Sequence, residues 1–292
     1  MNDQTKGLLI TVFGVLCIVP DALFVRLIDA STMTVTMWRN VLCGGVMLIA
    51  MLILHRGQTL KAIRAAGKAG LIYAVCAAGA SILFVLSVRL TTVANTVFII
   101  SSLPVFAAFY SWLLMGERIS KRMAWTIGLV MIGLIIIGYG SLGQEGSNIW
   151  GDLAALGVAA IFSLGLTVAR QKKSVSMVPM AAVAYLACGI LLIPFSQPFN
   201  VPNDDWIFVI LHGGVFIAIS TAMLAIGPRY IPSAEVAVII LLESVLAPLL
   251  VWFVIGEEPH TSALIGGGLV IGVLFISNLI VLTRKRPQTV QK

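Results

Sequence analysis

The feature that most constrains this chain is a succession of apolar runs, each close to the length of a membrane-crossing helix. A helix needs about 20 apolar residues to cross the ~30 Å hydrocarbon core of a bilayer. The connections between runs are short, the longest covering about 55–68, and leave no room for an extramembrane domain. The sequence therefore predicts an all-α integral membrane protein with ten transmembrane helices, at about 7–28, 33–54, 69–89, 92–114, 123–140, 150–169, 176–196, 205–226, 233–255 and 262–283.

Composition supports this class and excludes others. The chain is 59% hydrophobic and 11% charged, whereas soluble domains are roughly a quarter charged. The net charge of +7 is not presented on any polar stretch of domain size, so nucleic-acid binding is not expected. HExxH, GxSxG and Walker motifs and paired metal-ligand spacings are missing from the sequence. We therefore expect no enzyme activity, no metal and no cofactor.

The basic residues set the orientation of the helices. Sixteen of the 19 Lys and Arg residues fall in the termini and in the connections on the same side as the termini. The opposite connections carry acids such as Asp152, Asp205 and Glu257. Lys and Arg concentrate in cytoplasmic connections. The sequence therefore predicts a multi-pass protein of the cell inner (plasma) membrane with both termini cytoplasmic.

The chain contains an internal repeat. Residues 94–136 align without gaps to 234–276 at an offset of 140, and 13 positions are identical. The matches include Trp112 with Trp252 and the pair Gly116-Glu117 with Gly256-Glu257. Each half, 7–140 and 150–284, then holds five spans, and because five is odd the second half crosses the membrane upside down. Inverted repeats are typical of secondary transporters, in which they give two near-equivalent states.

Two segments resemble a known family. SLPVFAAFYSWLLMGERIS at 102–120 and LLESVLAPLLVWFVIGEEP at 241–259 are similar to the EamA-type drug/metabolite transporter superfamily, and the resemblance covers essentially the whole chain. Ser244 stands where the family usually has proline, and Pro248 follows one turn later. The overall likeness is closest to bacterial exporters of amino acids, including aromatic ones. The resemblance implies a small-molecule exporter.

Ionisable residues inside the spans are candidate site residues, because each costs roughly 2.5–3.5 kcal/mol at mid-depth. Asp21 and Arg39 both lie ~10 Å below the outer surface, on helices joined by a short turn. We expect an ion pair between them. The pair is either purely structural, or Arg39 exchanges one carboxylate, that of Asp21, for that of a substrate. Arg26, nearer the helix end, is expected to extend its head group to the surface.

Further polar residues complete the predicted substrate site. Arg39 would hold a substrate carboxylate, and Glu243 or Asn95 would hold an amine. For each polar residue the alternative is a buried polar group that only satisfies its neighbours. The predicted substrate-binding set is Arg39, Asn95, Ser101, Tyr185, His212, Glu243 and Ser244.

Prolines inside spans point to gating positions. Pro20, Pro104 and Pro248 each remove a backbone hydrogen bond in the first, fourth and ninth helix. A carbonyl freed in this way is tolerated only against protein or a water-filled cavity. We therefore expect these prolines, with Asp21, to line the path or bend during transport. Ordinary kinks without a function are the alternative.

The sequence is compatible with two functions. The first is a secondary transporter or facilitator that exports small metabolites, above all amino acids including aromatic ones, by alternating access through a central cavity. The second is an efflux carrier for drugs, lipophilic cations or other metabolites that is coupled to protons. The expected partners are the small-molecule substrate and the lipid bilayer. The sequence is compatible with a monomer, and an oligomer is equally compatible with it.

Overall fold

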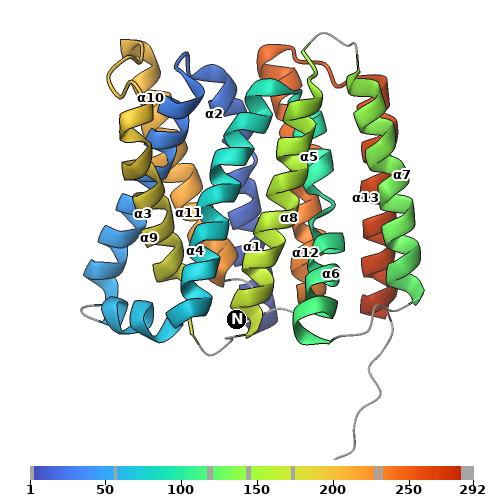
Figure 1. Ribbon diagram of the computed structural model, residues 1–292, viewed down its shortest axis with the longest axis horizontal. Coiled ribbons are helices and arrows are strands. Elements are labelled where there is room, and N and C mark those ends of the chain that lie inside the picture. Colours follow the sequence, from blue (N-terminus) through green and yellow to red (C-terminus); the bar gives the residue numbers. More distant parts are fainter. Residues whose placement is uncertain are drawn as a thin grey trace, which may run out of the picture.

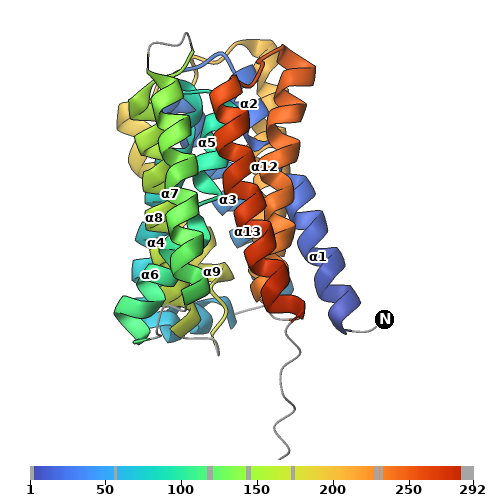
Figure 2. The same cartoon turned by 90° about the vertical axis from the view of Figure 1, so that its right-hand side faces the viewer.

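The computed structural model describes residues 3–55, 58–116, 121–142, 146–171, 175–226, 230 and 233–283. In this part of the chain all regular structure is helical, and the helices stand side by side as one bundle (Figure 1). The start of α1 and the end of α13 lie at the same end of the bundle in both views (Figures 1 and 2). An even number of crossings produces this arrangement.

The first half of the chain holds seven helices. They are α1 (Asp3–Ile18), α2 (Asp21–Leu27), α3 (Thr32–His55), α4 (Gln58–Leu90), α5 (Val93–Ile100), α6 (Leu103–Met115) and α7 (Lys121–Ser141). The second half holds α8 (Ile149–Gln171), α9 (Val178–Leu192), η1 (Ile193–Phe195), η2 (Asn203–Asp205), α10 (Trp206–Val209), the π-helix η3 (Ile210–Ile217), α11 (Ala218–Ile226), α12 (Ser233–Ile255) and α13 (Thr261–Thr283).

Eight stretches of the described chain are long and apolar enough to cross a membrane. They run from Thr5–Leu27 to Asn203–Ile226, and the apolar stretches Leu242–Ile255 and Thr261–Ser277 are shorter. The protein is therefore an integral membrane protein made of helices. The count of ten crossings in two inverted repeats stays a prediction.

The third span begins earlier than the sequence predicts. The expected connection 55–68 is largely helical, since α4 already begins at Gln58. Gly67 interrupts this helix with φ 54° and ψ −143°, a conformation open mainly to glycine. The segment before Gly67 keeps Lys61 and Arg64 exposed while Thr59 and Ala66 are buried. A search for purely apolar runs misses such an amphipathic helix.

Two expected spans are broken into pairs of helices. The first span is interrupted at Val19-Pro20 between α1 and α2, and the fourth at Ser101-Ser102 between α5 and α6. Pro20 precedes α2, and Pro104 lies in the first turn of α6, where proline costs no hydrogen bond. Pro248, in contrast, lies inside α12, which continues past it.

The interior of the bundle is closely packed, and its exterior carries exposed apolar side chains. The largest core cluster joins α2, α4, α5 and α8 through residues such as Val25, Val85 and Ala155. Glycines allow backbones to approach. A Cβ on Gly133 of α7 would lie 2.8 Å from the Gly266 carbonyl oxygen of α13. Side chains such as Leu54 and Phe253, 75% and 90% exposed, form a surface suited to lipid.

Candidate functional site

A buried carboxylate lies at the break in the first span. Asp21 begins α2 immediately after Pro20. It accepts a hydrogen bond from Arg39 Nε of α3 at 3.0 Å (Oδ1) and one from Arg39 Nη2 at 2.6 Å (Oδ2). The two residues are 2% and 6% exposed. The ion pair that the sequence predicts is therefore present. Its two parallel hydrogen bonds give the bidentate geometry in which arginine recognises a carboxylate.

The same carboxylate contacts the second half of the chain. His212 Nε2 lies 2.6 Å from Asp21 Oδ1, and the imidazole is 1% exposed. His212 belongs to the π-helix η3, and π turns in helices occur frequently at functional sites. The ring of Phe24 stacks on the imidazole with 5.6 Å between centroids. Asp21 is thus shared by two nitrogen-bearing side chains, one from each half.

Two further polar residues fix the arginine. Arg39 Nη1 donates to Ser81 Oγ of α4 at 2.7 Å, and Ser81 Oγ donates to Asn40 Oδ1 at 2.8 Å. Asn40 Nδ2 in turn donates to the Thr36 carbonyl oxygen at 2.9 Å. The Phe84 ring lies 5.4 Å from the guanidinium carbon. Sequence reasoning missed Ser81 and Asn40, although a buried serine and asparagine inside apolar spans were a usable signal.

Glu243 and Tyr185 lie around the same arginine. Glu243 of α12 is within electrostatic range of both Asp21 and Arg39, and it is only partly buried. In the described part of the chain it makes no hydrogen bond or ion pair. Tyr185 of α9 is within electrostatic range of Arg39. Four predicted site residues, Arg39, Tyr185, His212 and Glu243, therefore gather around Asp21; we call these five side chains the central cluster.

The remaining predicted residues lie in two other places. Ser101, at the end of α5, shares a hydrogen bond with Ser244 of α12 and so joins the two halves. Asn95 of α5 instead donates to Ser147 Oγ at 2.9 Å and to Asp152 Oδ1 at 3.3 Å. Thr91 Oγ1 donates to the same Asp152 oxygen at 2.8 Å. These bonds involve Asn95 in holding α5 against α8, and its contact with a substrate amine stays a prediction.

The ends of the helices next to Asn95 are tied together by a second ion pair. Arg26 Nε lies 3.0 Å from Glu257 Oε2, and Arg26 Nη2 donates to the Thr91 carbonyl oxygen at 2.8 Å. Glu257 Oε1 also accepts from the backbone N–H of Val93, the first residue of α5, at 2.7 Å. The head group of Arg26, expected to extend to the surface, is 23% exposed and is paired with Glu257 in the turn between α12 and α13. We call Arg26, Glu257 and Val93 the latch.

Hollows described for this structure lie on the outside of the bundle. One of about 580 Å³ is lined by Leu249, Trp252 and Phe253, and one of about 290 Å³ lies between α7 and α13. A cavity between the two halves therefore stays a prediction. Within the described residues no group of three His, Cys, Asp or Glu side chains could hold a metal ion.

Comparison with known proteins identifies the class. The chain is 27% identical over 198 residues to an "Uncharacterized transporter" of Archaeoglobus fulgidus, covering 66% of this chain and 70% of that one. It is 30% identical over 219 residues to the "Uncharacterized transporter YwfM" of Bacillus subtilis, covering 70% and 71%. These relatives point to a transporter and not to an enzyme.

A solved structure and a protein family agree with this. A structure described only as "Crystal structure of protein" has the same fold, with a TM-score of 0.69 at 20% identity, covering 97% of this chain and 100% of that one. The EamA-like transporter family matches residues 5–139 and 149–279. With nearly the whole of the membrane-embedded chain matched, the protein belongs to the EamA-like transporter family.

Proposed function

We propose that this transporter exports small metabolites, above all amino acids including aromatic ones, by alternating access through a central cavity. The two five-helix halves have opposite orientation, both termini are cytoplasmic, and the membrane is the cell inner membrane. The observation that carries the proposal is the central cluster, in which one buried carboxylate is held by an arginine from the first half and a histidine from the second.

The chemistry of the cluster suits a zwitterion. A substrate carboxylate takes the place of Asp21 on the fork of Arg39, since it offers the same two oxygens. Asp21 then remains against His212. Glu243, partly buried and without a partner among the described residues, receives the substrate ammonium group. The rings of Phe24 and Phe84, which flank His212 and Arg39, supply an apolar surface for an aromatic side chain.

Alternating access is supported by the latch. Arg26 and Val93 belong to the first half and Glu257 to the second, so these contacts close the bundle at the end that the charge pattern assigns to the outside. Opening toward that side requires them to break. The breaks at Val19-Pro20 and Ser101-Ser102 supply places where the first and fourth spans can bend. Ser101 and Ser244 lie where the two halves touch and line the path.

A second function is favoured by one observation. Asp21, His212 and Glu243 are carboxylates and an imidazole close together inside an apolar bundle, which is the kind of group that carries protons through membranes. With a lipophilic cation as cargo, the same acids would bind the cation and protons in alternation. This alternative predicts no role for a substrate carboxylate.

Transport by the purified protein in liposomes separates the two functions. We expect release of preloaded radiolabelled phenylalanine to exceed that from protein-free liposomes. We also expect unlabelled phenylalanine to compete at least tenfold better than phenethylamine or phenylpropionate, each of which lacks one charged group. Equal competition by the three compounds would contradict recognition of a zwitterion. Flux of tetraphenylphosphonium alone, driven by a pH gradient, would establish the second function instead.

A further inference from the structure

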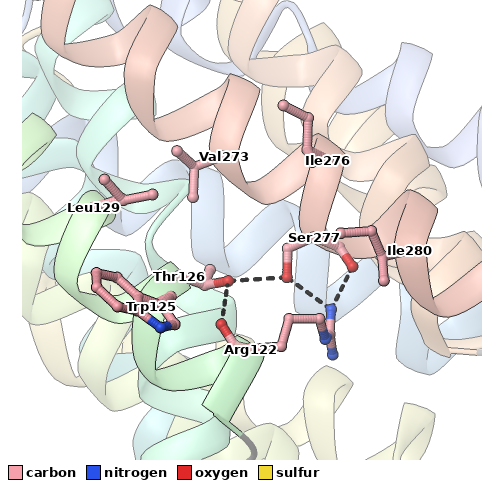
Figure 3. Close-up of a pocket in the computed structure, with 8 residues that line it drawn as sticks. All are labelled: Arg122, Trp125, Thr126, Leu129, Val273, Ile276, Ser277 and Ile280. Carbon is pink, nitrogen blue, oxygen red and sulfur yellow. Dashed lines mark hydrogen bonds between the residues drawn. The ribbon is translucent and has the colours of Figure 1, made fainter.

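A lipid-facing groove runs between the ends of α7 and α13, far along both helices from the latch. Its walls come from one face of each helix, because Arg122, Trp125, Thr126 and Leu129 are spaced at i, i+3, i+4 and i+7 (Figure 3). Val273, Ile276, Ser277 and Ile280 repeat this spacing on α13. The hollow has a volume of about 290 Å³. The two helices form one edge of the bundle (Figures 1 and 2).

The groove has a polar end and an apolar end. At the polar end Arg122 Nη1 donates to Ser277 Oγ at 2.7 Å and to the Ser277 carbonyl oxygen. Thr126 Oγ1 and Ser277 Oγ are 3.0 Å apart. Leu129, Val273 and Ile276 form the apolar walls further along, as Figure 3 shows. The indole of Trp125 is 76% exposed at the rim.

The charge of Arg122 is not balanced within this site. Its bonds go to a hydroxyl and a carbonyl, both neutral acceptors. Among the residues that the structure describes, no carboxylate lies within 4.0 Å of its guanidinium. Lys121 precedes it and is exposed. The polar end of the groove is therefore positive and calls for an anion.

From this geometry we infer that the groove is a binding site for an anionic phospholipid. The phosphate lies on Arg122, and an acyl chain lies along Leu129, Val273 and Ile276. Basic pockets between transmembrane helices bind anionic head groups. The charge of Arg122 lies at the depth of the bilayer at which these head groups lie. Trp125 belongs to the interfacial layer that tryptophan prefers. A zwitterionic lipid would leave the positive end without net compensation.

Quenching of Trp125 by brominated lipids tests this assignment. Full-length protein is placed in nanodiscs of phosphatidylcholine that contain a small fraction of brominated phosphatidylglycerol or, in parallel, brominated phosphatidylcholine. The difference between wild type and Trp125→Phe isolates the signal of this one tryptophan. We expect the anionic lipid to quench it at least twofold more than the zwitterionic lipid, and Arg122→Gln to abolish this preference.

Three controls make the result decisive. Lys121→Gln removes an equal charge from a neighbouring residue outside the groove and should keep the preference; an equal loss in both variants would overturn the site. Ile280→Trp fills the groove while Arg122 is retained. Compared with the double variant Ile280→Trp/Trp125→Phe, which subtracts the fluorescence of the added indole, it should also remove the preference, which covers the case in which Arg122→Gln unfolds. If neither lipid quenches Trp125 and the protein is dimeric in the nanodisc, a second copy covers this face and the inference is wrong.

Discussion

At the scale of single residues, Asp21 and Arg39 form a buried charge pair in which each side chain compensates the charge of the other. Removing one partner of such a pair leaves an uncompensated charge and costs about 3–5 kcal/mol. We expect Asp21→Ala and Arg39→Met each to lower the free energy of unfolding by about that amount. The double variant should lose clearly less than the sum. Unfolding in SDS titrations, followed by circular dichroism, measures all three, and strictly additive losses would contradict the coupling.

Glu243 should differ from this pair because it is not tied to any described residue. We expect Arg39→Ala and Glu243→Ala both to abolish amino-acid flux in proteoliposomes, with at least a tenfold loss of rate. Only the Arg39 variant should also lose stability. Glu258→Gln, an exposed acid in the turn between α12 and α13, is the control and should transport normally. Full flux in both Arg39→Ala and Glu243→Ala would remove these residues from the substrate site.

The contacts of these residues show which pairings can be predicted from a single sequence. Asp21 and Arg39 could be paired from the sequence because a short turn joins their helices and fixes their depth. The contact of His212 with Asp21, and that of Arg26 with Glu257, join residues far apart in the chain. They depend on which helices become neighbours, and hydropathy carries no information about that. Ser81 was overlooked because a lone hydroxyl in an apolar run satisfies itself on its own helix in most cases.

At the scale of elements, the apolar runs predict where helices lie, but not where a helix breaks or departs from α-helical geometry. The proline positions indicate the breaks before α2 and before α6, yet Pro248 lies in a continuous helix. The π-helix η3 contains no proline that would mark it in the sequence, and it packs against α3 and α2. The amphipathic start of α4 is not predicted by hydropathy, because Lys61 and Arg64 interrupt its apolar residues.

The packing of η3 against α3 can be tested with two adjacent glycines. A Cβ at Gly213 would lie 2.8 Å from the Arg39 carbonyl oxygen and 3.0 Å from its Cα, whereas one at Gly214 would meet only Val46 Cγ2 at 4.0 Å. We expect Gly213→Ala to destabilise by about 1–3 kcal/mol, because backbone must shift. Gly214→Ala should be neutral or stabilising by up to about 1 kcal/mol, as expected for a helical glycine. Thermal unfolding in detergent compares the two, and equal effects would contradict the close contact.

At the scale of the whole molecule, the short helix α2 connects the central cluster to the latch. It carries Asp21 at its start, against His212, and Arg26 in its last turn, against Glu257. Both partners belong to the second half of the chain. A movement of α2 that follows the exchange of Asp21 for a substrate carboxylate would therefore also strain the latch. This gives a physical route by which binding in the centre can open the end of the bundle that the latch closes.

Breaking the ion pair of the latch should shift the bundle toward an open state. Glu257→Gln keeps an oxygen that can accept from the Val93 N–H but loses the ion pair with Arg26. A partly exposed pair is worth about 1 kcal/mol, so the open population should rise about fivefold. Spin labels at Leu142, just after the first half, and Phe199, in the second half, both exposed, should report a longer distance component by electron–electron double resonance. Glu117→Gln changes the repeat mate of Glu257, which lies outside the described residues. It removes the same charge from a position that the sequence repeat predicts at the opposite end, and should leave this distance unchanged. If Glu257→Gln also leaves it unchanged, the Arg26–Glu257 pair does not hold this end of the bundle closed.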